Sequence, residues 1–232
     1  MGLLSRLLRS SSLRLGPELQ DRLQRLSELS PPPTRDSHRK SRYVTVDVET
    51  TGLDMRRDRV LSIGAVSVDA GTIDLALCFE VVLRQPESSS RDNILVHRIG
   101  GQRQLAGEDP AESLVRFLEY VAHAPLVAFR AEFDRTMIDR ALKETLGTAS
   151  QSAWLDLAEL LPALYPSNEN KTMDDWLKAM NIGMLARHDA LADALATAQM
   201  LQVCLHQAET LEMTCPAQLL EMQKAQHWLG KR

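Results

Sequence analysis

Residues 44–52, with the sequence VTVDVETTG, constrain the fold more than any other part of the chain. Three valines alternate there with polar residues, and side chains two positions apart in a strand share a face. The valines predict a buried face, and Asp47 and Glu49 lie on the other face, about 6–7 Å apart at a rise of roughly 3.3 Å per residue. Like charges at this separation repel each other unless a cation lies between them, and carboxylate oxygens suit Mg²⁺ or Mn²⁺.

The pattern of elements predicts an α/β fold. Strand-like runs come first and predict three antiparallel strands, at residues 43–49, 59–69 and 74–83. Residues 84–110 are expected to form a loop, and helical runs follow, among them residues 152–164. One short strand, residues 124–129, lies between helices. This order indicates a mixed sheet, with three antiparallel strands and then parallel strands, flanked by helices.

Composition divides the chain into three segments. Residues 1–42 form a basic helical arm that ends in a proline-rich linker, because leucines recur at helical spacing in PELQDRLQRLSEL and PPP follows. Residues 43–210 form the main domain, and residues 211–232 form a C-terminal helical tail. The arm is expected to pack on its own domain, on a partner or on a surface. Its first 16 residues also have the composition of a mitochondrial presequence, so we expect a cytoplasmic location with the mitochondrial matrix as the alternative.

Composition also excludes several classes of protein. No run of 18 apolar residues exists, so no transmembrane helix is predicted. Three widely spaced cysteines argue against a disulfide framework and against a thiolate zinc site. The net charge of −4 hides an asymmetry: nine Lys and Arg against four Asp and Glu give residues 1–43 about +5, which leaves about −9 for the rest. Such an acidic body is compatible with carboxylates that bind metal cations, which then bind phosphates.

A site for two metal ions needs more than two carboxylates, and the chain offers further candidates. Asp134 follows the strand at residues 124–129, where the chain passes into a helix, and Glu132 and Asp139 are its alternatives. Asp193 lies in RHDALADALATAQ, where the surrounding alanines would let a helix approach the sheet closely. Asp134 and Asp193 are therefore the third and fourth candidate ligands.

A histidine near the fourth acid is a candidate general base. His188 precedes Asp193 by five residues, which on an α-helix would leave the two about 140° apart. His188 can join the same site only from a loop, with Asp189 as the N-cap residue that begins the helix. A loop histidine in this place could take a proton from an attacking water.

With these residues in place, the chain resembles the DEDDh family of 3′–5′ exonucleases, the family of the proofreading epsilon subunit of bacterial DNA polymerase III. The resemblance covers about residues 43–207 and is carried by VDVETTGL, EFD and HDALADA in this order. It implies a ribonuclease H-like fold and makes residues 43–210 the exonuclease domain. It also implies that two Mg²⁺ or Mn²⁺ ions are held by Asp47, Glu49, Asp134 and Asp193.

The resemblance also implies an activity. A metal-dependent hydrolysis, with His188 as general base, would remove nucleoside 5′-monophosphates from the 3′ end of nucleic acid, with DNA favoured. The residues after the glutamate line the substrate end in this family, which makes Thr50, Thr51 and Leu53 candidates for contacts to the last nucleotide. The expected partners are nucleic acid with a free 3′ end and DNA polymerase subunits.

The chain departs from the family in the strand before the third acid. The family commonly has His-Asn there, and this chain has Phe129 and Arg130. One hypothesis is that Arg130 binds a phosphate while Phe129 stacks on a base or packs in the core, which would change the substrate preference. The other is drift at a tolerant position.

Two alternative functions follow from what the motifs leave open. The acids act on the phosphodiester, which DNA, RNA and short oligonucleotides share. They therefore do not show which of these is the substrate, because RNA differs from DNA in the 2′-OH. A weakly active module that docks nucleic acid or a polymerase is the second alternative. Its support is the Phe129–Arg130 pair and the acidic body.

Overall fold

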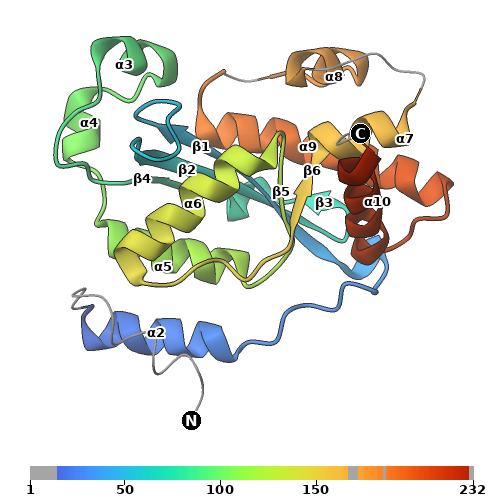
Figure 1. Ribbon diagram of the computed structural model, residues 1–232, viewed down its shortest axis with the longest axis horizontal. Helices are drawn as coiled ribbons and strands as arrows, with labels where there is room; N and C mark the ends of the chain where they lie inside the picture. Colours follow the sequence, from blue (N-terminus) through green and yellow to red (C-terminus); the bar gives the residue numbers. More distant parts are fainter. Residues whose placement is uncertain (1–14, 167–171, 185–186, 230–232) are drawn as a thin grey trace.

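The computed structural model describes residues 15–166, 172–184 and 187–229. The segment that resembles a presequence therefore lies, except for its last two residues, outside the described residues. One mixed sheet forms the centre, with helices on both faces (Figure 1). Its strands are β1 (Arg42–Thr50), β2 (Val60–Asp69), β3 (Thr72–Ile73), β4 (Phe79–Val82), β5 (Leu126–Ala128) and β6 (Trp154–Asp156).

The strand order gives the sheet an antiparallel half and a parallel half. The order is β3-β2-β1-β5-β6, and β4 pairs with β2 beside β3. β2 runs antiparallel to β1, β3 and β4, whereas β1, β5 and β6 run parallel. The predicted fold class, a ribonuclease H-like mixed sheet flanked by helices, is confirmed.

Helices cover both faces of this sheet. One face is covered by α5 (Pro110–Val121) and α6 (Ala131–Leu146), and the other by α7 (Leu157–Leu164), α9 (Ala190–Thr210) and α10 (Pro216–Leu229). The valines of β1 pack with the core residues of α5 and α6, as their alternation predicts. Three shorter helices lie at the periphery: α3 (Arg91–His97), α4 (Gly101–Leu105) and α8 (Met173–Ala179).

Three local expectations were wrong. The strand expected at residues 74–83 forms only over its second half, as β4, because Leu75–Leu77 form a short 3-10 helix. The loop expected at residues 84–110 contains α3 and α4. The helix expected at residues 152–164 begins as β6, because Trp154 and Leu155 pair with β5 before the chain turns into α7. The three residues of β6 are too few to show the alternation of apolar and polar side chains by which a strand is predicted.

The N-terminal arm packs on its own domain. Helix α2 (Pro17–Glu28) lies against α5, and its leucines contact the core shared with the sheet. Arg22 forms ion pairs with Glu112 and Glu119 of α5, each at 2.7 Å. The spacing of leucines thus serves an intramolecular contact in this structure.

The linker after the arm meets the start of the C-terminal helix and the residues just before it. The backbone N–H of His38 donates to Thr214 O, and that of Ala217 donates to Thr34 O, both at 2.8 Å. Leu219 of α10 is fully buried in the core between α7 and α9. The three cysteines are free, and none of the helices in the described ranges is long and apolar enough to cross a membrane.

Candidate active site

Strand β1 presents Asp47 and Glu49, and α6 brings Asp134 beside them. β1 pairs with β5 only at Val44 and Thr45, so the backbone of β1 beyond Thr45 has no strand partner on that side. The N–H of Val48 donates instead to Asp134 Oδ1 at 3.1 Å. A buried backbone donor needs an acceptor, and this bond fixes the carboxyl of the fourth residue of α6 next to the strand. Of the alternatives, Glu132 is exposed and Asp139 accepts from Ser150 N.

Helix α9 brings the fourth acid to the same place, because β2 has a glycine opposite Asp47. Gly64 pairs with Asp47, and a β-carbon on Gly64 would lie 2.2 Å from the carbonyl carbon of Ala190. The start of α9 therefore rests directly on the sheet. The hydroxyl of Thr45 also donates to Ala194 O at 2.8 Å, which holds α9 on β1. Asp193, the fourth residue of α9, is buried at this contact.

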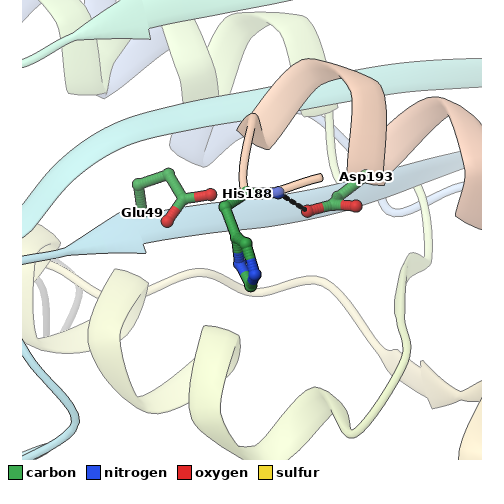
Figure 2. A group of neighbouring side chains, drawn as sticks. All are labelled: Glu49, His188 and Asp193. Atoms are coloured by element: carbon green, nitrogen blue, oxygen red, sulfur yellow. Dashed lines mark hydrogen bonds between the residues drawn. The ribbon is translucent and has the colours of Figure 1, made fainter. Parts of the chain in front are cut away.

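His188 lies in the loop ahead of α9, as its spacing from Asp193 predicts. Asp189 is the N-cap residue and accepts from Ala192 N at 3.0 Å. The backbone of His188 is left-handed, with φ of 58°, and its N–H donates to Asp193 Oδ2 at 3.1 Å. Figure 2 shows the exposed His188 side chain between the carboxylates of Glu49 and Asp193. One ligand atom from each of these three residues lies within 4.8 Å of the others.

A pocket of about 330 Å³ opens at this cluster. Its walls come from β1, the end of β5, the start of α8 and the loop before α9. The predicted site residues that line it are Asp47, Glu49, Phe129, Arg130, His188 and Asp193. Asp134 does not line the pocket but is buried behind it, near enough to Asp47 for their charges to interact.

Burial raises the pKa of all four carboxylates. Burial, followed by the charges of Asp134, Asp193 and Glu49, raises the pKa of Asp47 well above its usual range. Burial, followed by the charge of Asp193, raises the pKa of Glu49 to about 7. Burial likewise raises the pKa of Asp134 and of Asp193. Each carboxylate thus carries a cost for its negative charge in this site that a bound cation would remove.

The donor set fits divalent metal ions. Carboxylate oxygens converge from a strand and from two helix starts, and hard cations such as Mg²⁺ and Mn²⁺ bind oxygen ligands. Asp47, Glu49, Asp134 and Asp193 are the residues that would hold them.

Phe129 and Arg130 replace the usual His-Asn of the family. Both line the pocket, but they differ in how far they are exposed. Phe129 is half-buried and contacts the core under α7 and α9. Arg130 is exposed, and its backbone is left-handed with φ of 63°. Its N–H donates to Asp156 Oδ1 at 2.9 Å. The guanidinium of Arg130 is thus available at the pocket wall, while Phe129 is partly committed to the core.

The candidates after Glu49 lie at the end of β1 and in the turn that follows. Thr50 is buried and its hydroxyl donates to Gly52 O at 2.6 Å. The hydroxyl of Thr51 donates to Asp58 Oδ1 at 2.7 Å. Leu53 is 86% exposed, which leaves its whole side chain available to a ligand. None of these three side chains lines the pocket itself.

Among the pocket residues that were not predicted from the sequence, Arg187 forms an ion pair with one of the four acids. Arg187 precedes His188, and its guanidinium lies 3.2 Å from Asp193 Oδ1 and 3.6 Å from Asp174 Oδ1 of α8. Its positive charge opposes the rise in the pKa of Asp193 that burial causes. The signal in the sequence was an arginine directly before His188. The contact of Arg187 with Asp174 of α8 depends on the fold.

The mixed sheet flanked by helices has the ribonuclease H-like fold, with a carboxylate-lined pocket toward the end of β1. The model of the exonuclease family (RNase_T) matches residues 44–201, so the chain belongs to the exonuclease family. The predicted enzyme class, a 3′–5′ exonuclease of the DEDD type, is confirmed at the level of the family.

Similar proteins include PolC-type DNA polymerase III. The chain is 32% identical over 159 residues to the protein of Caldanaerobacter subterraneus subsp. tengcongensis and 29% identical over 163 residues to that of Clostridium perfringens. These matches cover 68% and 69% of the chain and 11% of each polymerase, so the chain spans about a tenth of these relatives.

Solved structures share the fold. Escherichia coli Exonuclease I in complex with a dT13 oligonucleotide superposes with a TM-score of 0.63 at 20% identity, covering 74% of the chain and 42% of Exonuclease I. Exonuclease X in complex with 5′-overhanging duplex DNA gives a TM-score of 0.60 at 18% identity, covering 78% of the chain and 99% of Exonuclease X.

Proposed function

We propose that this protein is a metal-dependent 3′–5′ exonuclease that removes nucleoside 5′-monophosphates from the 3′ end of DNA. The observation that carries the proposal is the placement of three carboxylates and His188 at one pocket, with the carboxylate of Asp134 buried directly behind it. Asp47, Glu49, Asp134 and Asp193 would hold two Mg²⁺ or Mn²⁺ ions. Such ions, when bound, stabilise the charge that develops on the attacking and leaving oxygens.

The other residues of the pocket have separate roles in this proposal. His188 is exposed in a loop at the pocket mouth, and its imidazole accepts the proton of the attacking water. The water oxygen bonds to the terminal phosphorus, and the bond from phosphorus to the 3′ oxygen of the preceding nucleotide breaks. That oxygen keeps the electron pair of the bond and takes a proton from solvent, which leaves a 3′-OH on the shortened strand. The exposed guanidinium of Arg130 binds a phosphate of the strand, and Leu53 contacts the last base.

DNA is the favoured substrate because of the proteins to which the chain is similar. The curated relatives are replicative DNA polymerases, and the solved neighbours hold an oligonucleotide of dT and a DNA duplex. The same relatives support an association with DNA polymerase subunits. Co-purification with a DNA polymerase tests this association separately from the activity. If no complex forms at saturating concentrations of the polymerase, the association is contradicted.

Hydrolysis of 5′-labelled single-stranded DNA and of RNA of the same sequence, with Mg²⁺ or Mn²⁺, tests the proposal. We expect a ladder that shortens from the 3′ end and releases 5′-monophosphates, faster with DNA. Asp47→Ala should abolish it, whereas Asp21→Ala, which removes an exposed acid from α2, should not change it. Faster cleavage of RNA would overturn the choice of DNA, and no metal-dependent cleavage of either would overturn the proposal.

A further inference from the structure

The outer edge of β6 is completed by a side chain from the C-terminal helix. β6 pairs only with β5, so the backbone groups on its other edge need partners from elsewhere. Gln223 of α10 is the partner of one N–H and one carbonyl on this edge. Its Oε1 accepts from Asp156 N at 2.7 Å, and its Nε2 donates to Trp154 O at 3.3 Å. The amide group of Gln223 thus bonds to β6 as a neighbouring strand would.

The strand end that Gln223 holds carries a carboxylate that caps a second helix. Asp156 is the N-cap residue of α7 and accepts from Ala158 N at 2.8 Å. The same carboxylate accepts from Arg130 N and from Ala131 N, each at 2.9 Å. α6 begins at Ala131 and has no cap from the side chain of Arg130. Asp156, the last residue of β6, therefore caps α6 in place of a residue that adjoins this helix in the sequence.

Helix α6 is the helix that carries Asp134. Asp134 is its fourth residue, one turn from the cap, and it meets Val48 N at 3.1 Å. A path thus runs by hydrogen bonds from α10 to β6 and from β6 to the start of α6. It continues along the first turn of α6, which is a rigid connection, and ends in the hydrogen bond from Val48 to Asp134.

We propose that Gln223 and Asp156 are positioning residues that set the place of Asp134 in the metal site. The proposal rests on the function proposed above, and it gives the C-terminal helix a part in the active site although α10 does not line the pocket. Groups that orient metal ligands through hydrogen bonds commonly change metal affinity by about 10–100-fold when they are replaced. Because Gln223 acts through two intermediates, we expect the lower end of that range.

The first test measures Mn²⁺ affinity by electron paramagnetic resonance or calorimetry, without nucleic acid. Gln223→Leu removes both hydrogen bonds to β6 and should weaken Mn²⁺ binding about 10-fold. Gln218→Leu is the matched control, because Gln218 lies on the same helix and its amide bonds to Thr214 N and Glu212 O instead of to the sheet. It should bind Mn²⁺ as the natural protein does. Equal affinities for the Gln223→Leu and Gln218→Leu proteins would overturn the proposal.

A double-mutant cycle separates positioning from a general loss of stability. Asp156→Asn alone should weaken Mn²⁺ binding by at least as much as Gln223→Leu. Arg130 N and Ala131 N donate to different oxygens of Asp156, and asparagine replaces one of these oxygens by an NH₂ group that cannot accept. Adding Gln223→Leu to Asp156→Asn should then cost little more, since both act on one path. If the loss of Mn²⁺ affinity in the double variant equals the product of the losses in the two single variants, the proposal is overturned. Asp156→Asn stays informative if Gln223→Leu does not fold, and unchanged affinity in that variant would also overturn the proposal.

The measurement also separates this proposal from the function on which it rests. If the natural protein binds no Mn²⁺ at the pocket, with Asp47→Ala as the reference, the proposed function fails first. If the natural protein binds Mn²⁺ and Gln223→Leu does not weaken it, only the role of α10 fails.

Discussion

Replacing Gly64 by alanine is the sharpest test of how the site is assembled. A β-carbon at this position would lie 2.2 Å from the carbonyl carbon of Ala190 and 2.3 Å from Leu191 N. Non-bonded carbon atoms approach no closer than about 3.5 Å at their optimum, so the start of α9 must move away by about 1.3 Å. Both neighbours belong to backbone, which cannot rotate out of the way as a side chain can.

The expected loss of activity follows from what α9 carries. Asp193 lies on the first turn of α9, and Gly64 pairs with Asp47 on the neighbouring strand. Moving one of these carboxylates by about 1 Å relative to the other should lower kcat by about 100-fold, which corresponds to roughly 2.7 kcal/mol of activation free energy. Crowding of the core should also lower the free energy of unfolding by about 1–3 kcal/mol.

The assay is single-turnover hydrolysis of 5′-labelled DNA, measured beside thermal unfolding of the same preparation. Gly183→Ala is the matched control, because a β-carbon there meets nothing within 4 Å. It should leave both quantities unchanged. A Gly64→Ala protein with the natural rate and the natural stability would refute the close seating of α9 on the sheet.

Three further predictions concern the charges of the pocket. His188→Gln should lower kcat by about 10²–10⁴-fold, the usual contribution of a general base, with Mn²⁺ affinity unchanged; a matching loss of Mn²⁺ binding would make His188 a ligand instead. Without divalent cations, thermal stability should fall as the pH rises from 4.5 to about 7, because folded Glu49, with its pKa of about 7, holds its proton more tightly than the unfolded chain does. Mn²⁺ should remove that fall, and stability that rises over this range would contradict it. Arg130→Ala should raise KM for DNA by about 10-fold, the value of one hydrogen bond to a charged group, as measured in steady-state kinetics; an unchanged KM would show that the Arg130 guanidinium binds no phosphate of the strand.

Much of the site could be predicted because its signals are local. The alternation in β1 places Asp47 and Glu49 on one face, and the strand is long enough for that period to be visible. The five-residue spacing of His188 and Asp193 required a loop histidine and an N-cap at Asp189, and both were found. These inferences need only the geometry of a single strand or a single helix.

The remaining features depend on contacts between distant residues, so no local pattern contains them. β6 is only three residues long and is defined by its pairing with β5. The need for glycine at position 64 arises from Ala190, which lies 126 positions further along the chain. Gln223 looks like any polar residue of a surface helix until the edge of β6 is placed beside it.

The hydrogen bonds between the linker and the start of α10 join the two terminal segments of the chain to each other. Thr34 and His38 meet Ala217 and Thr214, and this junction lies before the start of β1, whereas the acids lie toward the end of that strand. From the junction α2 and α10 each pack on the domain, α2 on α5 and α10 on α7 and β6. A change in the linker would therefore act on both terminal helices at once.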